Sequence, residues 1–181
     1  DNQRLAIFTE RRKGVFSENV RSWVLIYAES LIDDLANQIV TTKIDKDISF
    51  MIAVYLTLQF QISHKEIFLI LNNKNQTYRE LSEFLRKQLW KSYDLIEAYA
   101  EIYYPKKIRL IEKTIILRNI DKNWKYHLKQ MIFIKTAIGW RSYGQLDPLL
   151  EYKNEAFNLF IDTTREIKYN AIYNVLKSRI V

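Results

Sequence analysis

The chain has 181 residues, 48% of them hydrophobic and 14% aromatic, which is enough to build the core of one ordinary globular domain or two small ones. Three glycines and two prolines are too few for the turns of a many-stranded β fold, so the composition predicts an all-α chain. The lack of cysteine excludes disulfides and thiolate metal sites, while a net charge of +7 leaves nucleic acid, an anionic lipid surface or an acidic protein surface open as partners.

The N-terminal stretch predicts a helix over residues 2–16. Because neither an initiator methionine nor a signal region precedes it, we expect it to be the end of a longer helix. Gly14 and Ser17 are expected to mark its break, with Ser17 capping the helix that follows. In that second helix, apolar residues recur at intervals of three and four and predict one buried face. These residues are Val20, Val24, Tyr27, Leu31 and Leu35.

A polar connector and an apolar run over residues 48–62 come next in the chain. The run is too short and too often interrupted by polar residues to cross a bilayer, which needs about 20 apolar residues. Part of the run alternates apolar and polar residues as a β-strand does. A single strand would leave its backbone groups without a hydrogen-bond partner, so we expect residues 49–58 to be helical. Capping boxes at residues 63–66 (SHKE) and 77–80 (TYRE) predict two further helix starts, with the second helix running over residues 78–104.

Two long helices are predicted at the C-terminal end of the chain. The first is expected over residues 105–139, on the order of 50 Å at 1.5 Å per residue, and the second starts with Asp147 as N-cap and Pro148 as its first residue. Each carries an apolar stripe at helical spacing. The stripes consist of Leu117, Ile120, Trp124, Leu128, Met131, Ile134 and Ile138 in the first helix, and of Leu150, Phe157, Phe160, Thr164, Ile167, Ala171 and Val175 in the second. Two such helices joined by a short loop pack antiparallel, because only that arrangement buries both stripes.

The tip of this helical hairpin lies within GWRSYGQLDP, residues 139–148, which holds two of the three glycines and one of the two prolines. Small polar residues suffice to reverse a chain, so the side chains of Trp140, Arg141 and Tyr143 indicate a turn that contacts another molecule. We therefore interpret the tip as the candidate binding site.

Catalytic and metal-binding patterns are not found in the sequence. Three scattered glycines cannot form the loop that cradles a nucleotide phosphate, so no ATP site is expected in this chain. Neighbouring carboxylates such as Asp33 and Asp34 sit in polar surroundings and are interpreted as solvated helix faces. His64 and His127 are too far apart to form a metal-ligand pair. We expect no catalytic residue, no metal site and no catalysis by this chain alone.

Three ordered blocks of the C-terminal half resemble the SecA family of ATP-driven preprotein translocases. The blocks are IDKNWKYHLKQM, RSYGQLDP and EYKNEAFNLF, against the family patterns D-x-x-W-x-x-H-L-x-x-M, L-R-G-Y-A-Q-x-D-P and EYK-x-E-x-F-x-M-F. The matching residues are Asp121, Trp124, His127, Leu128 and Met131, then Arg141, Tyr143, Gln145, Asp147 and Pro148, then Glu151, Tyr152, Lys153, Glu155, Phe157 and Phe160. Residues 2–34 also resemble the family, whereas residues 41–101 match loosely.

The resemblance implies an all-α fold with a long antiparallel two-helix hairpin, the scaffold and finger, and an inserted smaller helical wing domain. It divides the chain into the end of a long scaffold helix at residues 1–16, the wing at 17–104 and the scaffold two-helix finger at 105–181. ATP and magnesium would bind motor domains absent from this chain. The sequence departs from the family at Ala137, Ser142 and Gly144, so the glycines of the tip are redistributed.

The resemblance also assigns roles to the tip. Tyr143 would contact the translocating polypeptide, Arg141 and Gln145 would add hydrogen bonds to it or to the channel, and Trp140 would anchor the base of the loop. A tyrosine suits this task because it offers a large apolar face and freezes few torsions. The alternative is that Tyr143 folds back onto the hairpin.

The other motif residues are interpreted as structural: Asp121, Trp124, His127, Asp147 and Pro148. A buried tryptophan and a hydrogen-bonded histidine one turn apart are typical of helix packing. Most lysines and arginines are interpreted as solvated.

The resemblance names partners as well: unfolded preprotein, a SecY-type channel, the remaining SecA motor domains and an anionic membrane surface. Abundant Ile, Lys, Asn and Tyr indicate AT-rich coding, as in many plastid genomes and in low-GC bacteria. Because the family has plastid members that feed the thylakoid channel, the resemblance implies the plastid stroma and thylakoid surface, with a bacterial cytoplasm and inner membrane surface as the alternative. A basic helical module that binds nucleic acid is the alternative function, and a plain structural helical domain is the third. Nucleic acid is not the expected partner.

Overall fold

The computed structural model describes residues 1–41, 77–141 and 147–178, together with Lys65 and Leu69. Within these residues all regular structure is helical, which confirms the all-α prediction. The helices are α1 (Asn2–Phe16), α2 (Val20–Thr41), α5 (Tyr78–Tyr103), α6 (Ile108–Arg141) and α7 (Pro148–Lys177). The predicted helix at 49–58 and the predicted capping box at 63–66 lie outside the described residues.

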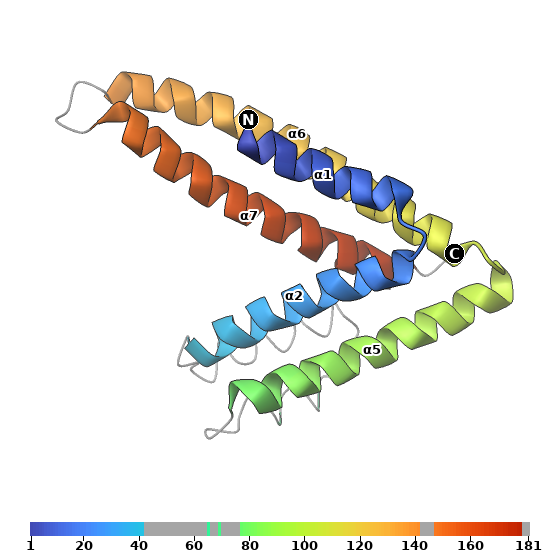
Figure 1. Cartoon of the computed structure of the whole chain (residues 1–181). Helices are drawn as coiled ribbons and strands as arrows, with labels where there is room; N and C mark the ends of the chain where they lie inside the picture. Colours follow the sequence, from blue (N-terminus) through green and yellow to red (C-terminus); the bar gives the residue numbers. More distant parts are fainter. Residues whose placement is uncertain (42–64, 66–68, 70–76, 142–146, 179–181) are drawn as a thin grey trace.

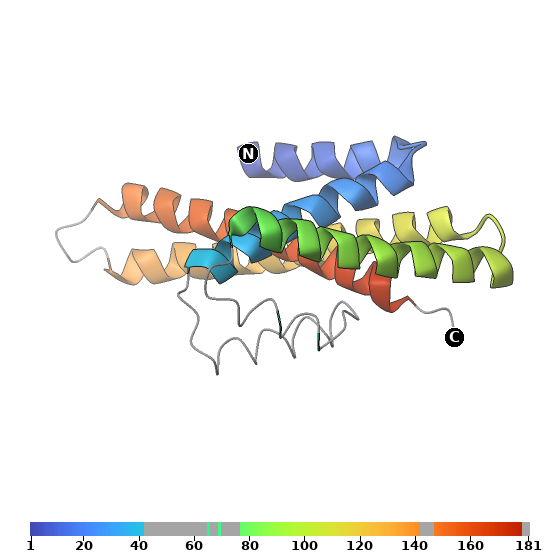
Figure 2. The same cartoon turned by 90° about the horizontal axis from the view of Figure 1, so that it is seen from below.

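The two long helices α6 and α7 lie side by side and antiparallel, and they form the most extensive helix pair of the described chain (Figures 1 and 2). This arrangement confirms the predicted hairpin. The first helix begins at Ile108 rather than at Pro105, because residues 104–107 form a turn. In that turn the Lys107 amide donates to the Tyr104 carbonyl over 3.1 Å, and Lys106 takes a left-handed backbone conformation with φ of 63°.

The buried faces of the hairpin differ from the predicted stripes at its outer end. Ile120 and Ile138 are buried as expected, but Leu128 is 41% exposed, and on α7 Leu150 and Phe157 are about 60% exposed. Figure 1 shows the reason: α1 and α2 cover the inner half of the hairpin, whereas its outer half consists of α6 and α7 alone. Two helices without a third layer cannot bury a wide apolar stripe on each.

The remaining helices pack onto the inner half of the hairpin. The first, α1, lies along α6, while α2 contacts α5, α6 and α7, so that α2 and α5 form a second arm that diverges from the hairpin (Figure 1). The predicted face of α2 is confirmed: Val20, Val24, Tyr27 and Leu31 are buried and Leu35 is half-buried. The largest side chains that are fully buried are Tyr93, Ile32, Leu81, Ile116, Ile120, Ile172, Leu176, His127 and Glu112.

Helix starts follow local side-chain chemistry, with one predicted cap misplaced. At α5 the capping box is confirmed, because the Thr77 hydroxyl accepts from the Glu80 amide over 3.3 Å and the Glu80 carboxylate accepts from the Thr77 amide over 3.2 Å. The predicted cap at Ser17 is wrong, because Ser17 ends α1. The first turn of α2 is instead capped by Asn19, whose side-chain oxygen accepts from the Ser22 amide over 3.0 Å.

Gly14 lies in the last turn of α1 rather than at a break, and it is buried against Trp23 of α2. A Cβ atom on Gly14 would lie 1.8 Å from the Trp23 ring, so only glycine lets the two helices approach this closely. Two further bonds hold the corner: the Trp23 indole and the Tyr27 hydroxyl both donate to one oxygen of Glu10, over 3.0 and 2.9 Å.

Candidate functional site

The candidate site is the tip of the hairpin, reached at the ends of α6 and α7. The backbone of Trp140 and Arg141 forms the last turn of α6. The side chains of these two residues, and Tyr143 and Gln145 entirely, lie outside the described part of the chain, so their assigned roles stay predictions. The structure does describe how the helices that carry this tip begin, end and are held.

The exit from the tip is fixed by a capped helix start. Asp147 is the N-cap of α7, where its carboxylate accepts from the Leu149 amide over 2.9 Å. The Asp147 carbonyl accepts from the Glu151 amide over 3.1 Å, and Pro148 occupies the first helical position, where no amide donor is needed. The helix therefore begins directly after the tip.

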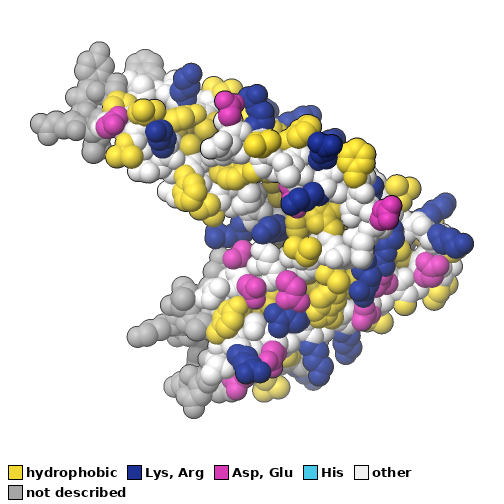
Figure 3. Space-filling view, viewed as in Figure 1, with side chains coloured by type: hydrophobic (Ala, Val, Ile, Leu, Met, Phe, Trp, Pro, Cys, Tyr) yellow, Lys and Arg dark blue, Asp and Glu magenta, His cyan; other side chains and the backbone are white. Residues whose placement is uncertain are grey.

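Apolar side chains are exposed on both helices near the tip. On α6 they are Ile132 and Phe133, exposed by 68% and 70%; on α7 they are Leu149, Leu150 and Phe157, exposed by 58–61%. Figure 3 shows apolar side chains gathered on the outer half of the hairpin. We call the surface formed by these five side chains the outer apolar surface. The sequence predicts that Leu150 and Phe157 belong to a buried stripe, and their exposure shows that this prediction is wrong.

The middle of the hairpin is fastened to α1 through His127, whose side chain is fully buried. Its Nδ1 lies 3.0 Å from the Thr163 hydroxyl on α7, and its Nε2 lies 3.0 Å from the side-chain oxygen of Gln3 on α1. The side-chain nitrogen of Gln3 donates to the Ala156 carbonyl over 3.0 Å. One imidazole thus joins α1, α6 and α7.

The hydrogen bonds around His127 indicate its tautomer. Because the nitrogen of Gln3 is engaged by Ala156, its oxygen faces the imidazole and can only accept, so Nε2 carries the proton. Nδ1 lies 3.0 Å from the Thr163 hydroxyl, whose single proton is donated either to Nδ1 or to the Leu159 carbonyl at 2.8 Å. Burial lowers the pKa of His127 below its usual value, which favours this neutral form.

Two rings enclose the imidazole and complete this junction. Trp124 stacks on His127 with ring centres 5.1 Å apart and an interplanar angle of 20°, and Phe160 meets it edge-on at 5.7 Å. A second tie joins the same helices, since the Arg11 guanidinium contacts both carboxylate oxygens of Asp121 over 2.8 and 3.3 Å. The sequence motifs include the α6 residues of these contacts, but they give no signal for the α1 partners Gln3 and Arg11.

A buried polar cluster joins α5 to α6 where the two arms meet. The Tyr93 hydroxyl donates to one oxygen of Glu112 over 2.6 Å, and Arg109 donates to the other oxygen over 2.6 Å and to the Tyr93 hydroxyl over 2.8 Å. Arg109 also contacts Glu97, which accepts from Arg21 of α2 over 3.3 Å. Burial, followed by the bond to Glu112, raises the pKa of Tyr93, which therefore stays protonated.

Over residues 1–41, 77–141 and 147–178 no three His, Cys, Asp or Glu side chains lie close enough together to hold a metal ion. The helices described there include none with both the length and the apolar character that crossing a bilayer requires.

Comparison of the sequence with models of known protein families shows the family of this chain. The model of the SecA wing and scaffold domain matches residues 1–179. The chain belongs to the SecA wing and scaffold family. The SecA match therefore includes residues 41–101, where the motifs alone gave only a loose resemblance.

Individual SecA proteins show the same relationship over the whole chain. The chain is 40% identical over 181 residues to a protein translocase subunit SecA of Porphyra purpurea, covering 100% of this chain and 20% of that protein. It is 40% identical over 182 residues to the SecA subunit of Gracilaria tenuistipitata var. liui, with the same coverage. The SecA subunit of Thermosynechococcus vestitus is 33% identical over 185 residues, covering 98% of this chain and 19% of that protein. The chain thus spans about one fifth of the length of the curated SecA relatives it matches.

Proposed function

We propose that this chain is the wing and scaffold part of a SecA protein-translocation motor and that its hairpin tip guides unfolded preprotein into a SecY-type channel. The observation that carries the proposal is the family match over residues 1–179 together with the long antiparallel hairpin of α6 and α7. Figure 1 supports it, because the C-terminal end of α6 and the N-terminal end of α7, which flank the tip in the chain, lie farthest from the base where the two arms join.

In this proposal Tyr143 contacts the moving polypeptide, Arg141 and Gln145 add polar contacts, and Trp140 anchors the loop. A translocated polypeptide presents every kind of side chain in turn, so its guide needs contacts that are strong without being sequence-specific. Aromatic faces provide such contacts. The outer apolar surface, next to the tip, supplies further area of the same character.

The hairpin must transmit force if it pushes or guides a chain, and its attachment suits that task. The junction at His127 lies between the base and the tip and joins α6 both to α7 and to α1. The Arg11 to Asp121 contact adds a second attachment of α6 to α1 one to two turns nearer the base. Sliding α6 along α1 would break the Gln3 and Arg11 contacts together, and sliding it along α7 would break the Thr163 contact.

The energy source, partners and location follow from the same proposal. ATP and magnesium would bind motor domains that make up other parts of the SecA subunit, and this chain would bind no cofactor. Its partners would be preprotein, the channel, those motor domains and an anionic membrane surface. The chain is 40% identical to the relative from the red alga Porphyra purpurea and 33% identical to that from the cyanobacterium Thermosynechococcus vestitus, and this difference supports a plastid stroma and thylakoid surface location over a bacterial one.

The test is Tyr143→Ala in the full-length SecA subunit that contains this chain, measured as transport of a preprotein into vesicles that carry the channel. We expect transport to fall about tenfold, comparable to the loss of an interface side chain that contributes about 1.4 kcal/mol. Tyr126→Ala is the matched control, because Tyr126 is a 55% exposed tyrosine on the same hairpin. Equal transport by the Tyr143 variant and the unmodified subunit would refute the assigned role of the tip.

A further inference from the structure

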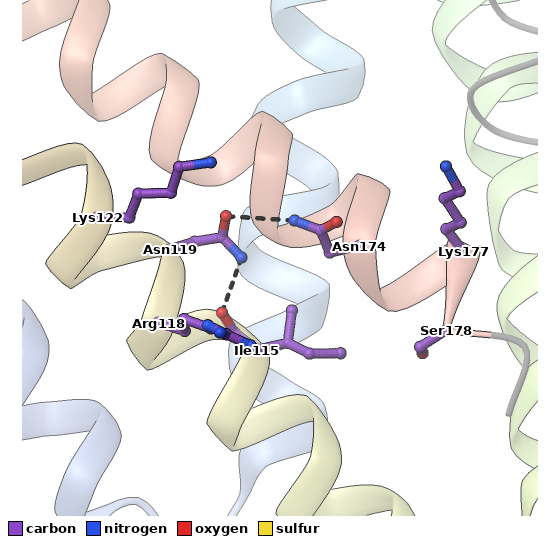
Figure 4. Close-up of a pocket in the computed structure, with 7 residues that line it drawn as sticks. All are labelled: Ile115, Arg118, Asn119, Lys122, Asn174, Lys177 and Ser178. Carbon is purple, nitrogen blue, oxygen red and sulfur yellow. Dashed lines mark hydrogen bonds between the residues drawn. The ribbon is translucent and has the colours of Figure 1, made fainter. Parts of the chain in front are cut away.

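A groove at the base of the hairpin gathers positive charge from both of its helices. The groove has a volume of about 410 Å³ and lies between the first half of α6 and the last turn of α7 (Figure 4). Arg118 and Lys122, one turn apart on α6, line it from one side, and Lys177 of α7 lines it from the other. The described residues that line the groove include no carboxylate.

The three cations of this groove are not neutralised within the described chain. Arg118 and Lys122 make no ion pair there, and no carboxylate of the described residues lies within 4 Å of them. Lys177 donates to the Tyr173 hydroxyl over 3.0 Å and lies 5.3 Å from the centre of that ring, so both of its contacts are with a neutral group. Three residues with formal positive charge therefore line one groove, and no described carboxylate forms an ion pair with any of them.

The floor of the groove is polar and is held in place by amide side chains. The Asn174 side-chain nitrogen donates to the Asn119 side-chain oxygen over 3.3 Å, and the Asn119 nitrogen donates to the Ile115 carbonyl over 2.8 Å (Figure 4). Asn119 is only 7% exposed. Each amide nitrogen carries two protons, so the Asn174 amide keeps one donor for a ligand.

The carbonyls at the C-terminal end of α7 would oppose an anion, and two of them, those of Asn174 and Val175, accept hydrogen bonds from Ser178. The Ser178 amide donates to the Asn174 carbonyl over 2.9 Å, and the Ser178 hydroxyl donates to the Val175 carbonyl over 2.6 Å. Capping of these carbonyls, together with the charge of Lys177 in the last turn, offsets the negative end of the helix.

We infer that this groove binds a phosphate group, held by Arg118, Lys122 and Lys177 and by the Asn174 amide. A phosphate suits the groove because it is tetrahedral and multiply charged, so it accepts from donors on several sides, whereas a carboxylate presents one charge in one plane. The phosphate belongs either to a lipid headgroup or to a soluble phosphate ester. This inference does not depend on the proposed role of the tip.

The experiment titrates the 181-residue chain with inorganic phosphate at constant ionic strength, held with chloride, and follows the side-chain amide signals of Asn119 and Asn174 by NMR. We expect saturable shifts of both signals. Arg118→Gln with Lys122→Gln is expected to weaken the apparent affinity about tenfold, if each exposed charge contributes about 0.7 kcal/mol. All these side chains except Asn119 are on the surface, so circular dichroism should show unchanged helix content.

The matched control is Lys125→Gln with Lys129→Gln, which removes the same charge from exposed positions of α6 outside the groove lining. Its affinity should stay within about twofold of the unmodified chain. Equal weakening by both double variants would overturn the inference, because binding would then follow net charge. The absence of saturable shifts at the two asparagines would overturn it as well.

A second arm identifies the source of the phosphate by co-sedimentation with vesicles. Binding to vesicles of phosphatidylglycerol in phosphatidylcholine that is lost in the groove variant and kept in the control assigns the groove to lipid headgroups. Shifts with inorganic phosphate but identical vesicle binding by all three proteins assign it to a soluble phosphate ester. A single-stranded oligonucleotide that binds the chain more tightly than inorganic phosphate and the vesicles do would overturn the inference. The groove would then be part of a nucleic-acid surface.

Discussion

Replacing Tyr93 with phenylalanine removes one oxygen atom from the cluster that joins α5 to α6. The hydroxyl donates to Glu112 and accepts from Arg109, and the Tyr93 and Glu112 side chains are each only 1% exposed. A hydrogen bond to a charged group contributes about 1.5–3 kcal/mol to stability. Because Arg109 keeps its own bond to Glu112, we expect a loss near the lower end, about 2 kcal/mol.

The assay is equilibrium unfolding in urea, with a thermal scan beside it. A loss of about 2 kcal/mol in a chain of this length corresponds to a decrease of about 4–8 °C in Tm. Tyr99→Phe is the control, because Tyr99 lies on the same helix, is 45% exposed and forms a ring contact with Tyr103 that the change preserves. It should alter the free energy of unfolding by less than about 0.5 kcal/mol.

A Tyr93→Phe variant as stable as the Tyr99→Phe control would refute this account of the cluster. A double-mutant cycle with Glu112→Gln sharpens the test. If the two groups interact as the 2.6 Å contact indicates, their coupling energy should be about 0.5–3 kcal/mol, and additive losses would contradict a direct bond.

Two further predictions concern the contacts of α1 with α2 and with α6. Gly14→Ala should destabilise the chain by about 1–3 kcal/mol, because the new methyl group meets the Trp23 ring of α2. Gly139→Ala adds a methyl group that no described atom beyond its own helix backbone approaches within 4 Å, so it should be neutral or stabilise the chain by up to about 1 kcal/mol. Urea unfolding compares the two variants, and similar effects of both changes would contradict the tight α1–α2 contact. Burial lowers the pKa of His127 in the folded state below the value of about 6.5 that histidine has in the unfolded chain. Between these two pKa values the unfolded chain binds more protons than the folded one. The free energy of unfolding should therefore fall as the pH drops from 7 towards the folded-state pKa. Urea unfolding measured at pH 7.5 and at decreasing pH should show this loss of stability, and His127→Gln should make the free energy of unfolding depend less on pH. An unchanged pH dependence in the variant would contradict the assignment to His127.

Local signals were sufficient to predict where several helices begin. The capping box at Thr77 and the Asp147–Pro148 pair satisfy or remove donors within a few residues, so their effect does not depend on distant parts of the fold. The antiparallel hairpin was also predictable, because two long stripes joined by a short connection leave one compact arrangement. Ser17 shows the limit of such signals, since Asn19 two residues later provided the cap instead.

Features that depend on a third helix were not predictable from the sequence. Leu150 and Phe157 have helical spacing in an apolar stripe, yet no described helix covers the outer hairpin, and both side chains are exposed. Conversely, polar residues of α6 are buried in its packing face. Glu112 and His127 are buried because Tyr93, Gln3 and Thr163 supply their hydrogen bonds, and these partners are 19, 124 and 36 residues away in the chain.

The central claim is that the hairpin tip touches the polypeptide during transport, and site-specific photo-crosslinking tests it most directly. A photoreactive residue is placed at Tyr143 or, as control, at Tyr126, in the full-length SecA subunit that contains this chain, and a preprotein is arrested during transport. The account predicts a crosslink to the preprotein from position 143 that requires ATP and is much weaker from position 126. Crosslinks of equal yield from both positions, or none from position 143, would contradict it.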